Sequence, residues 1–129
     1  MIAAGFGCRG GCVMGDILGA LDRALAIAGK ARGDVSALYA PDFKQGERGL
    51  AEAAETLGRP LVLLPLAALQ AHAGRCSTRS ERVMQRFGVP SIAETAACAG
   101  AGADSGLNPR LLGPRVVVGA ATCALALGM

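Results

Sequence analysis

The chain has 129 residues, of which 52% are hydrophobic and 18% charged, with a formal net charge of +3. This length suits one domain with a substantial core, and the composition excludes a disordered chain. The charge is mild, and Phe6, Phe43 and Phe87 do not alternate with basic residues, which argues against a nucleic-acid surface.

The longest apolar run, Val116 to Met129, is shorter than the about 20 residues that span a bilayer, so we predict no membrane contact. The N-terminal residues lack a basic region followed by a clean apolar stretch. Five cysteines at irregular spacing do not resemble a secreted disulfide framework. We therefore expect a cytoplasmic protein with mostly reduced thiols.

The first half of the chain alternates short apolar runs with amphipathic stretches. Buried strands are predicted over 2–6, 35–40 and 61–64, and the last is a continuous apolar run typical of a strand covered on both faces. The periodicity predicts helices over 14–31 and 47–57, followed by a short helix from 65 to 69.

Two capping-box patterns predict the next helices. Thr78 and Glu81 have the required spacing and would start a helix that runs to Phe87. Ser91 and Glu94 repeat the pattern and would open an alanine-rich helix that ends near residue 99.

The C-terminal part is predicted to be a glycine-rich loop over 100–109, followed by one or two strands of unassigned register within 111–126. Strands that alternate with helices indicate βαβ units. The sequence therefore predicts the α/β class, as a single three-layer α/β/α domain over 1–129 with a mostly parallel sheet.

A glycine-rich segment, Gly5-x-Gly7-x-x-Gly10, separates the first strand from the first helix and contains Arg9. Glycines let a backbone approach a ligand closely, and a helix start together with an arginine favours carboxylate or phosphate. The same glycine spacing matches a dinucleotide-binding fingerprint, which also needs an acidic residue about 20 residues later, at the end of the second strand. That residue is missing, because Asp34 precedes the second strand. A tight turn without a ligand is the structural alternative.

Two pairs with three intervening residues, Cys8 with Cys12 and His72 with Cys76, offer residue types that zinc accepts. Zinc sites usually pair their ligands within compact loops, whereas these pairs lie far apart, so we predict neither a metal nor another cofactor. Cys8 is either a nucleophile whose pKa a helix start and Arg9 lower, or a small residue in a crowded turn.

Parallel strands place the loops that follow them at one edge of the sheet, where α/β proteins bind ligands. The residues predicted to converge on that edge, beside several helix starts, are Arg9, Lys44, Arg79, Ser80 and Ser91. This arrangement favours a ligand with several carboxylates or phosphates. Glu47 and Glu94 belong to helix first turns, where capping explains them without any chemistry.

Different short motifs occur in a specific order along the chain: Gly5-x-Gly7-Cys8-Arg9, Lys44-x-x-Glu47-x-Gly49-Leu50, Leu57-Gly58-x-Pro60-Leu61, Ser80-x-x-Val83, Gly88-Val89, Ser91-x-x-Glu94-x-Ala96-Ala97, Leu111-Leu112 and Thr122-x-Ala124-x-Ala126. This order resembles the family formed by the stand-alone CobE protein of cobalamin biosynthesis and the C-terminal domain of CbiG. The sequence departs from that family at Gly10, where a second Arg is common, and at Cys12, where Thr or Ser is common.

The resemblance implies a role in building the corrin ring, with a precorrin or corrinoid intermediate of the aerobic pathway as ligand and other corrin-pathway enzymes as candidate partners. The substrate-binding residues that it suggests are Gly7, Cys8, Arg9, Gly10, Lys44, Glu47, Ser80, Ser91 and Glu94. Two alternatives stay open. One is a precorrin lactone hydrolase related to CbiG that uses Glu47, Cys8 or Ser80, and the other is a nucleotide-binding domain that uses the glycine loop.

Overall fold

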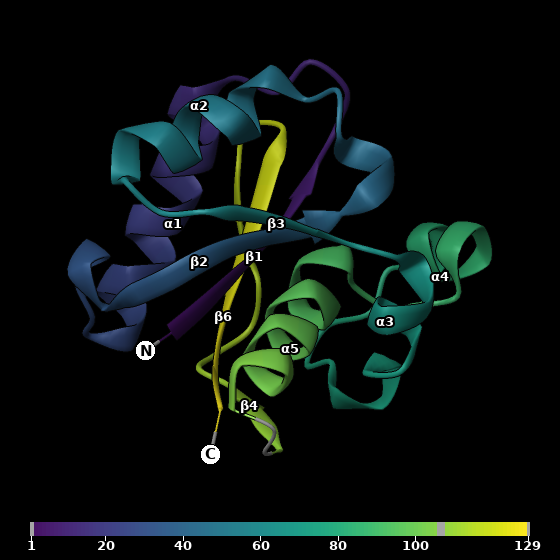
Figure 1. Cartoon of the computed structure of the whole chain (residues 1–129). Helices are drawn as coiled ribbons and strands as arrows, with labels where there is room; N and C mark the ends of the chain where they lie inside the picture. The colour runs from purple at the N-terminus through teal and green to yellow at the C-terminus, as the bar shows by residue number, and fades with distance from the viewer. Residues whose placement is uncertain (1, 106–107, 129) are drawn as a thin grey trace.

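A mixed β-sheet forms the centre of the computed structural model, which describes residues 2–105 and 108–128 (Figure 1). Its strands are β1 (Ile2–Cys8), β2 (Val35–Pro41), β3 (Leu61–Leu64), β4 (Pro109–Leu111), β5 (Val116–Val118) and β6 (Ala121–Gly128). The strand order is β3-β2-β1-β6-β4, and β5 also pairs with β6. β1, β2 and β3 run parallel, whereas β6 runs antiparallel to β1, β4 and β5.

Helices cover both faces of this sheet (Figure 1). They are α1 (Met14–Ala28), α2 (Arg48–Leu57), α3 (Leu66–Gln70), α4 (Glu81–Phe87) and α5 (Ile92–Ser105), with 3-10 turns at Arg32–Asp34, Asp42–Lys44 and Ala73–Arg75. α1 and α2 pack on one face, and α5 with α3 on the other. The α/β class and its three layers are confirmed, and the sheet is mixed because the C-terminal strands turn back along β1. None of the described helices is long and apolar enough to cross a bilayer.

The alternation of β1 separates the two halves of the core. Ala4 and Phe6 are buried against the α1 and α2 side. Gly5 faces α5, where an added Cβ would overlap the Ala93 carbonyl oxygen and the Ala97 backbone. This glycine therefore serves a close helix-to-strand approach, because α5 contacts the strand backbone directly.

The C-terminal ends of α1 and α5 lie at other residues than predicted, the first because of a local turn and the second because of a tertiary contact. α1 ends at Ala28 because Gly29 adopts a left-handed φ of 69°, which lets its N–H reach the last carbonyls. α5 continues to Ser105, so the predicted loop is wrong over 100–105, whereas 106–107 lie outside the described residues. Gly100 does not stop the helix, since its bare Cα lies against the ring of Tyr39 and keeps the helix on β2.

The first predicted capping box is wrong. Ser80, not Thr78, caps α4, and its hydroxyl accepts a hydrogen bond from the Val83 N–H at 3.3 Å. The hydroxyl of Thr78 donates to Glu94 instead. In the second box the Glu94 N–H donates to the Ser91 hydroxyl at 3.2 Å, so the start of α5 is confirmed.

Candidate functional site

The loops after β1 and β2 meet at one edge of the molecule, as predicted, and the segments on either side of α4 join them there. We call residues 9–12, 42–47, 77–80 and 86–91 the strand-end edge. The start of α5 joins it, because Ile92 lies beside Gly7 at the end of β1. The N–H of Ser80 donates to the Pro90 carbonyl at 2.9 Å, which ties the last two segments together.

The turn after β1 begins later than the sequence indicated. Gly7 still belongs to the strand, and the space where its side chain would be is taken by Thr122 Oγ1 at 2.5 Å. The turn closes through the Cys12 N–H, which donates to the Arg9 carbonyl at 3.0 Å. Gly11 has a positive φ of 78°, whereas nothing lies within 4 Å of the Cβ position of Gly10. Gly5 and Gly7 both belong to strand β1, so they form part of the sheet and not of a loop. The glycine-rich loop of the dinucleotide fingerprint is therefore not formed.

Arg9 is exposed and reaches across to the β5–β6 turn. Its Nη2 donates to the Gly119 carbonyl at 3.1 Å, and its backbone N–H donates to the Ala120 carbonyl at 3.0 Å. The guanidinium is thus held at the rim of the edge with one carbonyl partner, and its remaining donors can meet a carboxylate.

Glu47 connects the turn after β1 to the start of α2. Its Oε2 accepts a hydrogen bond from the Gly11 N–H at 3.2 Å, and its side chain does not cap its own helix. Gly49 makes this contact fit, because an added Cβ would lie 2.5 Å from the Cys12 carbonyl oxygen. The capping explanation for Glu47 is therefore wrong, and the residue joins two loops of the strand-end edge.

Cys8 and Cys12 form a disulfide, with their Cα atoms 6.0 Å apart. The expectation of mostly reduced thiols is wrong for this pair, because the turn at Arg9 brings the two ends of the loop together. Cys8 therefore presents no free nucleophile in this state, and Ser80 is engaged as a helix cap. The hydrolase alternative thus gains no support from Cys8 or Ser80.

The other candidate ligand pair, His72 and Cys76, does not lie beside the Cys8–Cys12 disulfide. Glu47 comes close to the sulfurs, whereas His72 and Cys76 do not. Burial, with a contribution from the positive charge of Arg75, lowers the pKa of His72. Burial, followed by the negative charge of Glu94, raises the pKa of the Cys76 thiol to about 11. The four-ligand zinc set is therefore not assembled.

Ser91 and Glu94 are fully buried, so they do not reach the surface of the edge. Glu94 Oε1 accepts hydrogen bonds from the N–H groups of Ser77 and Thr78 and from the Thr78 hydroxyl, each at 3.0 Å. Its Oε2 accepts from the Arg115 N–H at 3.1 Å. Glu94 thus fixes the 77–78 segment against α5, which is structural support for the edge and replaces the capping explanation.

The strand-end edge also carries an aromatic pair, Phe43 and Phe87, which the sequence did not predict. The rings of Phe43 and Phe87 stack with their centroids 4.9 Å apart and an interplanar angle of 7°. Lys44 Nζ lies 5.9 Å from the Phe43 centroid, and Arg86 Cζ lies 5.1 Å from the Phe87 centroid. Phe43 is 45% exposed, which is unusual for so large an apolar side chain. The signal available in the sequence was an aromatic residue two positions after the end of a strand.

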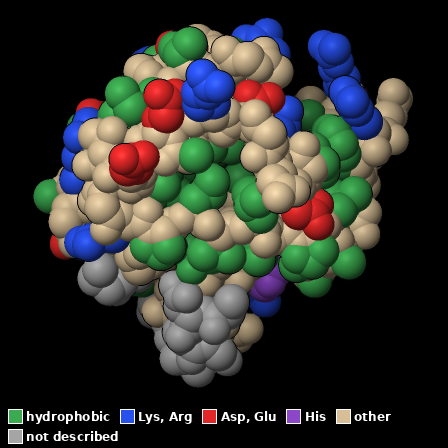
Figure 2. Space-filling model, turned by 45° about the horizontal axis from the view of Figure 1, so that its top comes forward, with side chains coloured by type: hydrophobic (Ala, Val, Ile, Leu, Met, Phe, Trp, Pro, Cys, Tyr) green, Lys and Arg blue, Asp and Glu red, His purple; other side chains and the backbone are tan. Residues whose placement is uncertain are grey.

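Figure 2 shows one face of the molecule with its side chains coloured by type. Hydrophobic side chains gather in its middle, and basic and acidic side chains lie along its upper margin.

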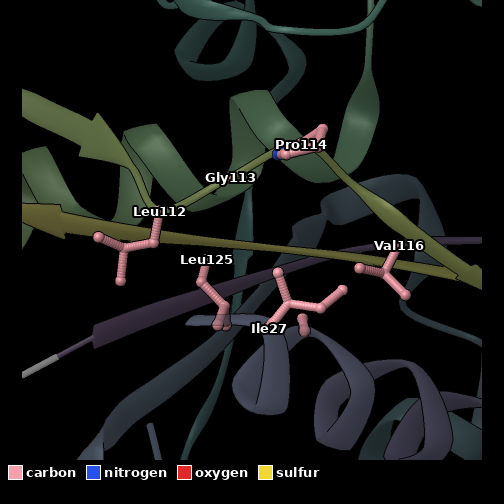
Figure 3. A pocket seen from close by; sticks show the side chains of 7 residues that line it. Ile27, Leu112, Gly113, Pro114, Val116 and Leu125 are labelled. Atoms are coloured by element: carbon pink, nitrogen blue, oxygen red, sulfur yellow. The ribbon is translucent and has the colours of Figure 1, made fainter. Parts of the chain in front are cut away.

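The hollow lined by Ile27, Leu112, Pro114, Val116 and Leu125 is small (Figure 3). Its volume of about 10 Å³ matches a single water molecule. Ile27 belongs to the last turn of α1, whereas the turn after β1 precedes the first, so the hollow lies at the other end of that helix.

Comparison with known proteins identifies the fold and the family together. The sequence model of the family described as "Cobalamin synthesis G C-terminus" matches residues 2–126. The curated protein CobE of Sinorhizobium sp is 32% identical over 125 residues, which cover 97% of this chain and 79% of the relative. The chain belongs to this CbiG C-terminal family.

Solved structures of the CbiG C-terminal family superpose over nearly the whole chain. CobE, from the cobalamin (vitamin B12) biosynthetic pathway, matches with a TM-score of 0.92 and 34% identity, covering 98% of this chain and 89% of that structure. The cobalamin biosynthesis protein chiG from Agrobacterium tumefaciens str. C58 matches with a TM-score of 0.75 and 37% identity, covering 99% and 98%. The chain is thus a cobalamin biosynthesis protein of the CobE and CbiG type.

Proposed function

We propose that this protein binds a polycarboxylate tetrapyrrole intermediate of cobalamin biosynthesis at the strand-end edge. The observation that carries the proposal is the Phe43–Phe87 stack, in which Phe43 is exposed, with Lys44 and Arg86 beside it. A precorrin or corrinoid combines a broad apolar ring system with acetate and propionate carboxylates at its margin. The aromatic pair offers a surface for the ring, and the cations offer partners for the carboxylates.

Arg9, in the turn after β1, adds a further exposed cation to the strand-end edge. Its guanidinium is exposed, and so is the neighbouring Gly10. We therefore keep Arg9, Gly10 and Lys44 from the predicted site and add the aromatic pair. The buried Ser91 and Glu94, the capping Ser80, and Gly7 and Cys8 are assigned supporting roles.

An open surface predicts moderate, salt-dependent affinity. Ionic contacts at exposed positions are screened by salt, and a ligand that stays partly hydrated gains little from desolvation. Such an edge suits a protein that receives an intermediate and releases it to another enzyme. The expected dissociation constant lies in the range of about 1 to 100 μM, equivalent to about 5–8 kcal/mol of binding free energy.

The test is a titration of the purified protein with hydrogenobyrinic acid, followed by its visible absorption at two salt concentrations. We expect a saturable spectral shift, weakened at high salt, and an at least tenfold weaker affinity for Phe43→Ala combined with Lys44→Ala. The matched control is Val117→Ala, which removes an apolar side chain that is 51% exposed on β5. An absent shift, or equal affinities for the double variant and the control, would overturn the proposal.

A further inference from the structure

We propose that Cys8, Cys12 and Glu47 form a binding site for a thiophilic divalent cation, with Zn²⁺ as the reference ion, when the disulfide is reduced. One ligand atom from each residue lies within 4.8 Å of the others. The site lies within the strand-end edge, beside Arg9 and Gly10, but its three ligand side chains are not among the groups proposed to contact the tetrapyrrole.

The donor set matches the chemistry of zinc. Two thiolate sulfurs and one carboxylate oxygen are ligands that Zn²⁺ accepts in a tetrahedral arrangement. At a Zn–S distance of about 2.3 Å, two sulfurs on one tetrahedral ion stand about 3.8 Å apart. The Cα atoms of Cys8 and Cys12 are 6.0 Å apart, so side-chain rotation supplies this spacing without movement of the strand or the helix. The exposed turn between the cysteines leaves the fourth position to water.

The third ligand is positioned before any ion arrives. The Gly11 N–H holds Oε2 of Glu47 at 3.2 Å, which is the kind of outer hydrogen bond that orients a metal-binding carboxylate. Gly49 brings the start of α2 against the Cys12 carbonyl, where a Cβ would lie 2.5 Å away. The two cysteines and the glutamate therefore face one another across a tightly packed contact.

The local electrostatics favour the charged ligands. α1 begins at Met14, two residues after Cys12, and its start has no side-chain cap. The positive end of a helix dipole stabilises negatively charged groups nearby. Two thiolates and one carboxylate around a divalent cation carry a net charge of −1, so the filled site also suits this helix end.

Cation binding and the disulfide exclude each other. A dithiol reductant supplies two electrons and two protons, which break the sulfur–sulfur bond of Cys8 and Cys12 and leave two thiols, while the reductant becomes its own disulfide. The cation then replaces the two thiol protons, which pass to solvent. A disulfide oxidant reverses the change: it takes up two electrons and two protons to become a dithiol, while the Cys8–Cys12 bond closes and the ion is released.

The test titrates the folded chain with Zn²⁺ by calorimetry, and with Co²⁺ as a probe for thiolate-to-metal absorption in the near ultraviolet, in the absence of any tetrapyrrole. Dithiothreitol reduces the protein and is removed under anaerobic conditions before the titration. We expect one equivalent bound by the reduced protein, none by the oxidised protein, and at least tenfold weaker binding by Glu47→Gln. Glu52→Gln is the matched control, because Glu52 is an exposed acid on the same helix.

Cysteine variants assign the ligands. Cys12→Ser should abolish the Co²⁺ absorption, whereas Cys76→Ser should leave it unchanged, with circular dichroism confirming that both variants fold. The proposal is overturned if the reduced protein binds no stoichiometric ion, if Cys12→Ser binds as tightly as the parent, or if Cys76→Ser loses the ion. Each result is read without a tetrapyrrole, so it leaves the proposed function unaffected.

Discussion

Replacing Glu94 with glutamine tests the support of the strand-end edge, since this buried carboxylate accepts hydrogen bonds on both oxygens. Oε1 faces the N–H groups of Ser77 and Thr78 and the Thr78 hydroxyl, and Oε2 faces the Arg115 N–H. In Glu94→Gln the amide oxygen can keep the partners on one side. The amide nitrogen then confronts the Arg115 N–H, so two donors oppose each other.

The expected cost follows from this mismatch. A hydrogen bond to a charged group contributes about 1.5–3 kcal/mol, and the bonds that remain become neutral and weaker. The smaller desolvation cost of a neutral amide offsets part of this loss. We expect a decrease of about 2 kcal/mol in the free energy of unfolding for Glu94→Gln, and of about 4 kcal/mol for Glu94→Ala, which leaves every donor unpaired.

The assay is urea unfolding followed by circular dichroism, combined with thermal melting. An unfolding entropy of about 2.1 cal/mol/K per residue converts 2 kcal/mol into a decrease of about 7 °C in Tm for a chain of this size. The control is Glu81→Gln, at an exposed acid paired with Arg79 on the surface, and it should not change the melting curve. Stability of Glu94→Gln within about 0.5 kcal/mol of the parent would refute the reasoning, because surface substitutions change stability by that much.

Three further predictions concern packing and thiol reactivity. Gly49→Ala should destabilise the protein by about 1–3 kcal/mol in urea unfolding, because the new Cβ would meet backbone atoms of the turn after β1. Gly46→Ala is the control and should not destabilise it, because nothing lies within 4 Å of its Cβ position. Equal urea midpoints for the two variants would contradict the close contact at Gly49. Gly5→Ala should cost at least as much, because its Cβ would overlap the backbone of α5, and a parent-like thermal melt would count against that contact. The alkylation rate of Cys76 in the oxidised protein should rise about tenfold per pH unit from pH 7 to 10, because its thiol has a pKa of about 11 and only the thiolate reacts. Mass spectrometry measures this rate, and a plateau near pH 9 would exclude this pKa.

Local signals in the sequence located most elements. The apolar run over 61–64 was predicted with the bounds of β3, and the start of α1 at Met14 was also correct. The end of α5 was missed because it depends on Gly100 packing against the ring of Tyr39, a contact with a distant strand. Local rules treat such a glycine as a helix stop, whereas the tertiary contact makes its small size an advantage.

The site was predictable in its location but not in its pairings. Parallel strands must deliver their following loops to one edge, so the meeting of the Arg9 and Glu47 segments follows from the pattern. The partners of Glu94 and the stacking of Phe43 on Phe87 join residues far apart in the chain. Periodicity and capping rules describe neighbours along the chain, so they assigned Glu47 and Glu94 to helix starts and left both phenylalanines without a role.

The most direct test of tetrapyrrole binding at the strand-end edge is a map of amide chemical-shift changes in the labelled protein on addition of hydrogenobyrinic acid. The account predicts changes that saturate and that concentrate at Arg9–Gly11, Phe43–Lys44 and Arg86–Gly88. Changes centred on the small hollow around residues 112–116, or no saturating change at the edge, would contradict it.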